Sequence, residues 1–343
     1  MWRAICGAAL TFCILFWNVE NYFDPFDDPL KNDNEFTPAA ERHWTWQRFE
    51  AKRDGLAQTI VAVADETGDL PALVGLAEVE NRMVVSQLVR KTMLSELGYD
   101  FVHRESPDER GIDVALLYRK DLLHVMAVDS LRIPGVVTRD ILYVKMRFRI
   151  KSGMTSAVNP NMTPTVIPDL TPTVIPDMTP TVIPGLTRNL DTNEDDIIHV
   201  FVVHLPSKRG GARASQDRRQ TALAVLEHAA DSLLADSPTC NIVVMGDFND
   251  GEARVAGLSV PPFDGPPAAP GTLKYHGRWE QIDWFCVSPA LDSSVRMQIF
   301  APPFLQEPDA AWLGTKPRRT YIGPRYNGGL SDHLPVYMKV IWP

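Results

Sequence analysis

The sequence predicts an α/β protein of the α+β kind, in which layers of β-sheet are covered by helices. Short runs of β-branched and aromatic residues recur along most of the chain, and three longer stretches carry apolar residues on one helical face. In addition, 45% of the 343 residues are hydrophobic, which is enough to form a large core. Strands that alternate with one-sided helices stack into layers, so these observations favour sheets with helices on their outer surfaces.

Eight runs have the length and composition of strands. In chain order they span residues 14–19, 73–79, 112–119, 141–150, 197–205, 241–248, 282–288 and 334–342. Strands therefore dominate the predicted fold, and the chain length fits either two domains or one large layered sandwich.

The clearest helix is predicted to begin at Thr37-Pro38, where a hydroxyl that can cap is followed by a proline at the first helical position. Its apolar residues recur at intervals of three, four or seven and form one stripe: Trp46, Phe49, Leu56, Ile60 and Val63. Two further helices are predicted at 84–97 and 215–234.

Composition limits the functions that the chain can have. The formal net charge of -9 argues against a broad, salt-dependent grip on a phosphate backbone, which needs clustered Lys and Arg. A nuclease is not excluded, because a metal site uses acidic residues to hold its cation, so any contact with nucleic acid is expected to be local. The four cysteines, Cys6, Cys13, Cys240 and Cys286, have no metal-site spacing, and we interpret them as free, buried thiols.

The N-terminus determines the expected compartment only weakly. Residues 1–10 contain an Arg and an apolar stretch, as a secretion signal does, but residues 12–19 form a predicted strand and leave no room for a cleavage site. We expect a cytoplasmic protein, with export as the alternative if the N-terminus is a truncated signal. No other run is long enough to cross a bilayer, no stable membrane association is expected, and the oligomeric state is undetermined.

One segment departs from the pattern of strands and helices. The hexapeptide Thr-Pro-Thr-Val-Ile-Pro begins at Thr163 and recurs at Thr171 and Thr179. Two prolines in every repeat exclude a helix and interrupt any strand pairing. We therefore expect a disordered, proline-rich insertion at about 152–191, between two strands of a single domain that spans 1–343, rather than a docking arm.

Several predicted strands end abruptly in residues that can bind a metal ion or transfer a proton. These residues are Asn18, Glu78, His204, Asp247, Asn249, Asp283, Asp332 and His333. Taken singly, each has an ordinary explanation, such as a strand end, a buried imidazole or a capped turn. Asp247 and Asn249 either share one face of a strand that continues through Phe248 or form an Asx turn. The occurrence of all eight residues at strand ends in one chain is harder to explain by such separate structural roles.

The combination resembles the endonuclease/exonuclease/phosphatase superfamily of deoxyribonuclease-like, metal-dependent phosphoesterases. The matching motifs are Trp17-Asn18, Ala77-Glu78, His204-Leu205, Gly246-Asp247-Phe248-Asn249, Ile282-Asp283 and Ser331-Asp332-His333, in family order. The Gly-Asp-Phe-Asn and Ser-Asp-His motifs together are a specific signal of the family, whereas each of the other motifs alone is a weak signal. The resemblance spans the chain outside the repeats and implies a four-layer α/β/β/α sandwich of two mostly antiparallel sheets with outer helices.

The resemblance also implies a metal site. Glu78 would be the principal ligand of a divalent cation, with Asn18 and Asp332 close by, either directly or through water. Hard oxygen ligands without a thiolate favour Mg²⁺, with Mn²⁺ as a possible substitute.

The remaining matched residues would be catalytic. Asp247 would position or deprotonate the attacking water, and Asn249 would hold that water or the phosphate oxygens. His333, oriented by Asp283, would contact the phosphoryl group. His204 would stabilise the developing charge or assist the leaving oxygen.

Four weaker candidates would bind substrate. Arg110 and Asp113 lie at the entrance of the strand 112–119, where Arg110 would reach a phosphate and Asp113 would orient His204; a simple surface pair is the alternative. Lys208 and Arg209 follow His204 on a glycine-containing loop that would receive substrate phosphates, unless it is only a solvated loop.

Two segments near the C-terminus contain aromatic residues that could contact a substrate. Residues 318–326 interleave arginines with tyrosines, which suits stacking on bases, but packing of the loop is the favoured interpretation. Residues 301–305 with Trp312 are the one candidate for the apolar hairpin that lipid-directed members of the superfamily tend to carry, and here too we expect packing.

We therefore expect Mg²⁺-dependent hydrolysis of phosphate esters, with a nuclease-like phosphodiesterase as the first interpretation. The expected partner is a phosphate-ester substrate, and nucleic acid is one candidate. A phosphatase, or an esterase of phospholipids or sugar phosphates, would share the same core and stays open as an alternative. A catalytically silent binding module is the alternative from another class, although every matched position carries a competent side chain.

Overall fold

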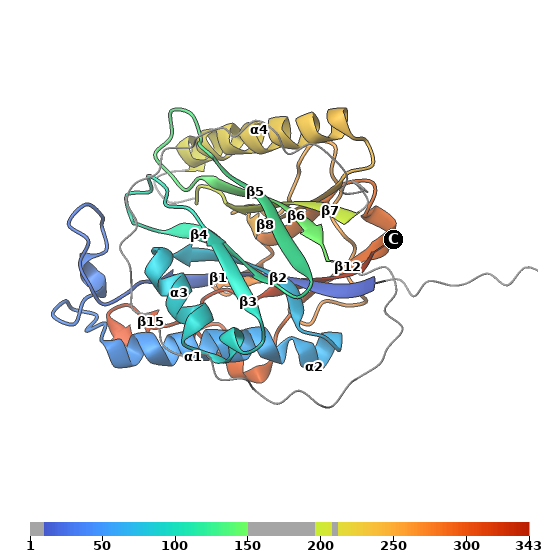
Figure 1. The fold of residues 1–343 in the computed structure, drawn as a ribbon. Coiled ribbons are helices and arrows are strands. Elements are labelled where there is room, and N and C mark those ends of the chain that lie inside the picture. Colours follow the sequence, from blue (N-terminus) through green and yellow to red (C-terminus); the bar gives the residue numbers. More distant parts are fainter. Residues whose placement is uncertain (1–9, 150–195, 208–211, 343) are drawn as a thin grey trace, which may run out of the picture.

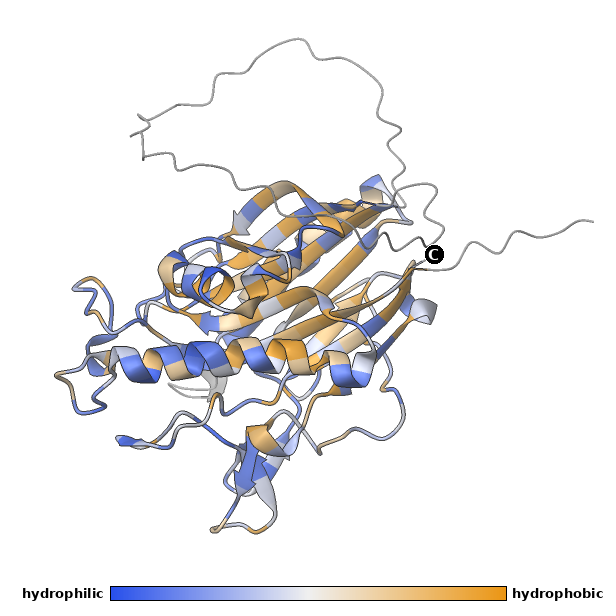
Figure 2. Ribbon diagram, turned by 60° about the horizontal axis from the view of Figure 1, so that its bottom comes forward, coloured by the Kyte–Doolittle hydropathy of each residue, from blue (hydrophilic) through white to orange (hydrophobic). Residues whose placement is uncertain are grey.

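The computed structural model describes residues 10–149, 196–207 and 212–342. Within these ranges two β-sheets pack face to face and helices cover the outer side of each, which gives the four predicted layers (Figure 1). The strands of both sheets are mostly apolar, whereas the helices are apolar on only part of their surface (Figure 2). The core lies between the sheets, where Gly75 leaves room for Met245 of the opposite sheet.

The first sheet has the strand order β12-β17-β1-β2-β4-β3. The strands are β12 (Val295–Ile299), β17 (Val336–Trp342), β1 (Leu10–Tyr22), β2 (Pro71–Val79), β4 (Asp113–Arg119) and β3 (Tyr99–His103). Among these neighbours only β1 and β2 are parallel.

The second sheet has the order β11-β8-β7-β6-β5. The strands are β11 (Asp283–Val287), β8 (Asn241–Asp247), β7 (Ile197–His204), β6 (Ile141–Phe148) and β5 (Leu123–Leu131), and only β7 and β8 are parallel. All eight predicted strands are present, while β3, β5 and β12 were not predicted. Strand β5 was missed because it lies at the sheet edge and most of its side chains are partly or fully exposed, which weakens the apolar signal.

The outer face of the first sheet is covered by three helices: α1 (Trp46–Ala62), α2 (Ala64–Thr67) and α3 (Arg82–Arg90). Helix α4 (Ala212–Asp236) covers the outer face of the second sheet. Apolar residues of α4 such as Leu226 pack against that sheet, whereas those of α1 join the main core. Short 3-10 turns occur at Asn34–Phe36, Met93–Ser95, Asp292–Ser294 and Pro303–Leu305.

The predicted start of the first helix at Thr37-Pro38 is wrong. Thr37 is extended, with φ -118° and ψ 161°, and α1 begins after Thr45, whose hydroxyl accepts a hydrogen bond from the Arg48 amide at 3.4 Å. The buried Trp44 donates to the Phe23 carbonyl at 2.8 Å, and this contact holds the preceding segment as a loop. Helix α3 begins earlier than the predicted residue 84, because Asn81 caps it, and ends at Arg90, well before the predicted residue 97.

Three short hairpins complete the described fold. They are β9 (Leu273–Tyr275) with β10 (Arg278–Glu280), β13 (Gln306–Pro308) with β14 (Thr315–Pro317), and β15 (Tyr321–Ile322) with β16 (Arg325–Tyr326). Their strands of two or three residues are too short to produce a periodic apolar signal.

The predicted insertion at 152–191 lies outside the described residues. The strands on either side of it are neighbours: β6 and β7 pair antiparallel, with Arg147 opposite Ile197. The chain that leaves β6 therefore re-enters the sheet beside the point where it left.

Other sequence-based expectations concern cysteines and membranes. Cys13 and Cys286 are buried and free, as predicted, Cys240 is buried as well, and Cys6 lies outside the described residues. No helix within the described ranges is long and apolar enough to span a membrane.

Candidate active site

The two parallel strand pairs bring the polar strand ends to one rim of the molecule. Asn18 lies opposite Ala77 in the β1–β2 pair, one residue before Glu78. In the other sheet His204 is the register partner of Asp247, which is also the partner of Asp283. Motifs that are far apart in sequence therefore meet, because parallel strands end at the same edge.

Irregular backbone at these strand ends turns the side chains toward a common space. The ladder between β1 and β2 shifts register between Asn18 and Tyr22, and the ladder between β2 and β4 shifts between Ala77 and Val79. Three residues at these interruptions have positive φ, Glu20 at 48°, Asn21 at 53° and Glu78 at 61°, and so does Asn249 at 51°, two residues after the end of β8. Bulges and left-handed residues of this kind redirect side chains and are frequent at active sites.

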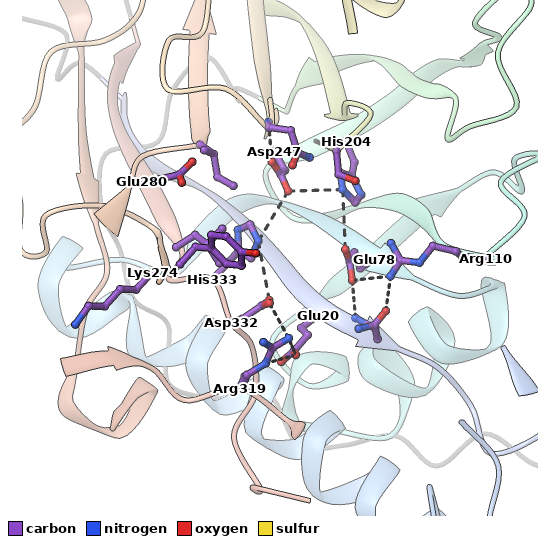
Figure 3. Close-up of a pocket in the computed structure, with 16 residues that line it drawn as sticks. Glu20, Glu78, Arg110, His204, Asp247, Lys274, Glu280, Arg319, Asp332 and His333 are labelled. Carbon is purple, nitrogen blue, oxygen red and sulfur yellow. Dashed lines mark hydrogen bonds and ion pairs between the residues drawn. The ribbon is translucent and has the colours of Figure 1, made fainter. Parts of the chain in front are cut away.

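These side chains surround a cavity of about 410 Å³ (Figure 3). Its acidic and basic lining residues are Glu20, Glu78, Asp247, Glu280, Asp332, Arg110, His204, Lys274, Arg319 and His333, and Asn21, Ser207, Asn249, Leu273, Tyr275 and Ile282 complete the wall. The expected neighbours Glu78 and Asp332 thus face one cavity. The structure also brings Asp247 and His333 together, with 3.9 Å between Asp247 Oδ2 and His333 Nε2.

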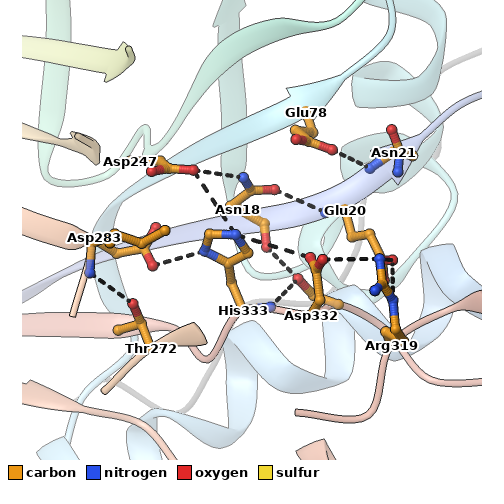
Figure 4. Close-up of polar contacts among 12 residues, drawn as sticks. Asn18, Glu20, Asn21, Glu78, Asp247, Thr272, Asp283, Arg319, Asp332 and His333 are labelled. Carbon is orange, nitrogen blue, oxygen red and sulfur yellow. Dashed lines mark hydrogen bonds and ion pairs between the residues drawn. The ribbon is translucent and has the colours of Figure 1, made fainter. Parts of the chain in front are cut away.

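Hydrogen bonds hold the His333 ring at Nδ1 and its backbone at both the amide and the carbonyl, and Asp247 and Asp332 lie near its Nε2 (Figure 4). Its Nδ1 lies 2.8 Å from Asp283 Oδ2, and its backbone carbonyl accepts a hydrogen bond from Trp17 Nε1 at 2.9 Å. Burial acts against protonation, but Asp283 and then Asp247 and Asp332 raise the pKa of His333 well above its ordinary value. The imidazolium is therefore fixed in place with Nε2 directed toward Asp247.

Ser331 explains why the first and last motifs occur together. Its hydroxyl donates to the Asn18 carbonyl at 2.6 Å and accepts from the His333 amide at 2.9 Å. The Trp-Asn strand end and the Ser-Asp-His turn therefore form one hydrogen-bonded unit.

Asp247 lies at the centre of the site. Asn18 Nδ2 donates to its Oδ2 at 3.1 Å, and the Asn249 amide donates to its Oδ1 at 2.9 Å. Burial, together with the nearby Asp283 carboxylate, raises the pKa of Asp247 to about 7. Strand β8 ends at Asp247, so the Asx turn, not a continued strand, describes this motif, and both Asp247 and Asn249 still face the cavity.

Asn18 and Asp283 lie behind the cavity wall. Asn18 is 1% exposed, and its Oδ1 accepts a hydrogen bond from the Glu20 amide at 3.0 Å. Both polar groups of the Asn18 side chain are thus used within the protein, which supports a positioning role more directly than a metal-ligand role.

His204 completes the row of imidazole and carboxylate groups. Its Nε2 lies 3.6 Å from Asp247 Oδ2 and 4.0 Å from Glu78 Oε1. Burial, then the charges of Arg139, Arg110 and His333, lower the pKa of His204 well below its ordinary value. A neutral imidazole therefore lies between the two carboxylates at neutral pH.

Glu78 projects from the bulge of β2. Its Oε2 accepts a hydrogen bond from the Asn21 amide at 2.9 Å and lies 3.6 Å from Nη2 of Arg110, which also lines the cavity. Its Oε1 accepts no hydrogen bond from any residue in the described ranges.

Glu20 and Arg319 are two of the cavity-lining residues that were not assigned from the sequence. Arg319 Nη2 lies 2.8 Å from Glu20 Oε1 and 3.0 Å from Asp332 Oδ2, so one guanidinium bridges both carboxylates. Burial and the adjacent Asp332 raise the pKa of Glu20 to about 7. Glu20 lies two residues after Asn18, and this spacing was an available signal, whereas nothing in the sequence distinguishes Arg319 from its neighbour Arg318.

The cavity fits a hard divalent cation, of the kind on which this family typically depends. Glu78, Glu20 and Asp332 all line the cavity. Glu78 Oε1 accepts no hydrogen bond from a described residue, whereas both Glu20 oxygens already accept hydrogen bonds from Arg319 and Thr320. Mg²⁺ prefers such oxygen ligands at about 2.0–2.1 Å and keeps several waters. Among the described residues, two groups of ligand atoms lie close enough together to hold one ion. Asp247 with Asp283 and His333 suits a cation less well, because Asp283 and His333 are already bonded to each other, and His103 with Glu105 and Asp113 does not line the cavity.

Asp113 is not placed as expected. Its Oδ1 accepts hydrogen bonds from the amide and hydroxyl of Ser106, and its Oδ2 lies 3.4 Å from His103 Nε2. Within the described residues His204 Nδ1 has no hydrogen-bond partner, so Asp113 does not orient it. The bulge at Ala77/Val79 pairs Asp113 with Val79 rather than with Glu78. Lys208 and Arg209 lie outside the described residues.

The two aromatic segments near the C-terminus differ from each other. Tyr321 is 4% exposed and Arg48 lies 4.3 Å above the Tyr326 ring, which confirms packing of that loop. Phe304 and Trp312 are 52% and 58% exposed, so neither is buried as expected, although Trp312 contacts the turn at Gly277 and Leu305, between them in sequence, is buried. A three-residue 3-10 turn turns Leu305 inward and leaves Phe304 outside.

Solved structures share this fold along nearly the whole chain. Truncated TDP2 from Caenorhabditis elegans is 15% identical, with a TM-score of 0.53, over 96% of this chain and 97% of that one. An endonuclease/exonuclease/phosphatase family protein from Bacteroides thetaiotaomicron is 12% identical, with a TM-score of 0.54, over 98% and 99%. The mannosyl-6-phosphatase Bt3783 of the same species is 13% identical, with a TM-score of 0.53, over 95% and 98%.

At such low identities the structural likeness shows the fold alone, and no curated protein sequence matches the chain significantly. The sequence profile of the Endonuclease/Exonuclease/phosphatase family, in contrast, matches residues 13–160, 186–257 and 267–341. The first break in this match falls within the proline-rich repeats. Because the profile covers most of the chain and every catalytic motif, the protein belongs to the endonuclease/exonuclease/phosphatase family and is a phosphoesterase hydrolase.

Proposed function

We propose that the protein hydrolyses phosphodiesters with Mg²⁺ and acts as a nuclease-like phosphodiesterase. The main support is the position of Asp247, whose Oδ2 lies 3.6 Å from His204 and 3.9 Å from His333. A carboxylate between two imidazoles can hold a water molecule next to a phosphate and accept its proton.

Glu78 and Asp332, with Glu20 as a further oxygen donor, would hold the divalent cation, and Asn18 would support them from behind the wall. When bound, the cation would supply positive charge that stabilises the phosphate in the transition state. Mn²⁺ would be the substitute, because it accepts the same oxygen ligands.

The chain's own residues account for the remaining steps. Asp247 takes the proton of the attacking water while the new oxygen–phosphorus bond forms, and Asn249 orients that water or a phosphate oxygen. The imidazolium of His333, held by Asp283, donates a hydrogen bond to the phosphoryl oxygens. As the bond to the leaving oxygen breaks, His204 stabilises the charge on that oxygen or assists its protonation, and Arg110 binds a phosphate oxygen.

A panel of substrates tests the nuclease-like assignment. Single-stranded and double-stranded DNA, RNA, sugar phosphates and phospholipid headgroups are incubated with the protein and Mg²⁺, and turnover is compared. We expect the highest kcat/KM on a nucleic acid. A preference for a sugar phosphate or a lipid headgroup would contradict the nuclease-like assignment, and absence of turnover on the whole panel would favour a silent binding module.

A further inference from the structure

An exposed aromatic cluster at the cavity mouth takes no part in the steps above. We refer to Tyr275, His276 and Trp312 as the aromatic rim. Tyr275 lines the cavity and is 63% exposed, and Trp312 is 58% exposed. The ring centroids of Tyr275 and His276 lie 4.2 Å apart, and those of His276 and Trp312 lie 6.5 Å apart. Large rings exposed at the mouth of a site are characteristic of ligand contacts.

The backbone fixes the shape of the aromatic rim. Tyr275 pairs with Arg278 across a two-residue turn, in which His276 and Gly277 have φ of 46° and 79°. Two left-handed residues in succession define the tight type I′ hairpin turn. A Cβ atom on Gly277 would lie 2.8 Å from the Trp312 ring, so Trp312 packs directly on this turn.

Lys274 joins the two hairpins that carry the aromatic rim. Its Nζ lies 2.9 Å from Asp309 Oδ2 and donates to the carbonyls of Leu313 and Thr315 at 2.8 and 3.2 Å. The Lys274 and Asp309 side chains are only 5% and 4% exposed. Lys274 therefore stabilises the position of Trp312, although it also lines the cavity.

The aromatic rim is also fixed relative to the catalytic histidine. Leu273 forms a β-bridge with His333, and the Leu334 amide donates to the Thr272 carbonyl at 2.7 Å. Tyr275 lies two residues beyond Leu273 on the same side of the strand, which is about 6.8 Å along it. A group attached to a phosphate at His333 would thus extend over Tyr275.

We propose that the aromatic rim stacks on an unpaired base of a single-stranded nucleic acid, next to the phosphate bound at His333. This inference rests on the proposed function. Stacking on aromatic rings needs a free base face, which single strands offer and paired interior bases do not. The exposed Arg278, opposite Tyr275, provides a cation for a neighbouring phosphate. Two carboxylates of the β13–β14 hairpin are paired with lysines, Asp309 with Lys274 and Glu307 with Lys316 at 3.6 Å, whereas Glu280 of the β9–β10 hairpin also lines the cavity.

Binding and turnover are measured separately for Tyr275→Ala, Trp312→Ala and Tyr275→Phe in the full chain. Anisotropy of a fluorescein-labelled oligothymidylate in EDTA gives the affinity, and kcat/KM with Mg²⁺ is measured on single strands, blunt duplexes and methyl p-nitrophenyl phosphate. We expect the two alanine variants to lose about 5- to 100-fold on single strands, with much smaller losses on the duplex and the small diester. Tyr275→Phe keeps the ring and should retain wild-type affinity.

Phe26→Ala is the matched control, because Phe26 is an equally exposed ring, at 61%, that does not line the cavity. Unchanged affinity for single strands in Tyr275→Ala would overturn the proposal. Equal losses on all three substrates would also overturn it, because they would indicate a structural role. So would Trp312-dependent binding to phosphatidylcholine vesicles without binding to oligothymidylate. Absence of turnover of methyl p-nitrophenyl phosphate by the wild type would instead count against the proposed function, while the anisotropy still tests stacking.

Discussion

At the scale of single residues, the site depends on carboxylates that are each held beside a positively charged or hydrogen-bonding partner. Asp283 is paired with His333, Asp247 receives hydrogen bonds from Asn18 and Asn249, and Glu78 Oε1, which belongs to a cavity-lining side chain, accepts no hydrogen bond from a described residue. Buried carboxylates without such partners would repel one another, and an added cation beside Glu78 would reduce that repulsion.

Replacing Glu78, Asp247 or His333 by alanine should therefore remove most activity and leave the fold intact. Removal of a group that binds the cation, the water or the phosphoryl oxygens typically costs about 10²- to 10⁴-fold in rate. The measurement is kcat for each purified variant, with circular dichroism to confirm folding and the exposed Asp129→Ala as control. Wild-type turnover in any of the three would disprove the role assigned to that residue.

Arg319 provides a second test at this scale. Because its guanidinium bridges Glu20 and Asp332, it should compete with a divalent cation for the same oxygens. We expect Arg319→Ala to bind Mn²⁺ about two- to fivefold more tightly, a range that reflects the modest strength of partly exposed ion pairs. Calorimetric titration without substrate measures this, and Arg319→Lys should change less. Weaker binding in the alanine variant would show that Arg319 supports the cation site.

The strongest motifs predicted most of the site because each ends an apolar strand. Asp247 ends one apolar strand, and His333 comes just before another. Because apolar runs indicate buried strands, the position of both residues at a strand end could be inferred from the sequence. The role of Asp113 was predicted wrongly, since a bulge in β2 changes which residue it lies beside. A bulge depends on backbone torsions, such as φ of 61° at Glu78, that the residue type does not reveal.

At the scale of elements, the close approach of β7 and β8 holds His204 beside Asp247. Gly246 makes this approach possible, because a Cβ atom there would lie 2.2 Å from the Val203 carbonyl oxygen. The strand that carries the Gly-Asp-Phe-Asn motif thus needs its glycine for packing as well as its carboxylate for chemistry.

Gly246→Ala should consequently destabilise the protein by about 1–3 kcal/mol, the usual cost of overpacking a core, and should lower activity by displacing His204 from Asp247. Gly251→Ala is the control, since a Cβ atom at Gly251 would meet nothing within 4 Å. Urea unfolding measures both variants. Equal stability of Gly246→Ala and wild type would show that the strands can separate without cost.

Elements were predictable where their signal was local and strong. The eight buried strands were found, whereas the start of α1 was misplaced because Thr37-Pro38 is as good a local signal as the actual cap at Thr45. Only the tertiary contact between Trp44 and the Phe23 carbonyl decides between the two.

At the scale of the whole molecule, two sheets meet so that their strand ends line one cavity. The overall sandwich could be expected from the family resemblance, and the structure confirms it. The substrate could not be predicted in the same way, since the hairpins that border the cavity have strands of only two or three residues.

Removal of residues 152–191 should leave folding and activity intact. The flanking strands β6 and β7 are already paired, so a short turn can replace the insertion, and a shorter loop lowers the entropy cost of closure slightly. Thermal unfolding and kcat of the deletion variant measure the effect. An insoluble or inactive product would show that the repeats contribute to the fold.

The central claim is that these strand ends form one metal-assisted site for phosphate-ester hydrolysis. Hydrolysis of bis(p-nitrophenyl) phosphate by the purified protein tests it most directly, with Mg²⁺, with EDTA, and with Mg²⁺ restored in excess of EDTA. We predict turnover that EDTA abolishes and Mg²⁺ restores. Turnover that is insensitive to EDTA, or no turnover with Mg²⁺ or Mn²⁺, would contradict the claim.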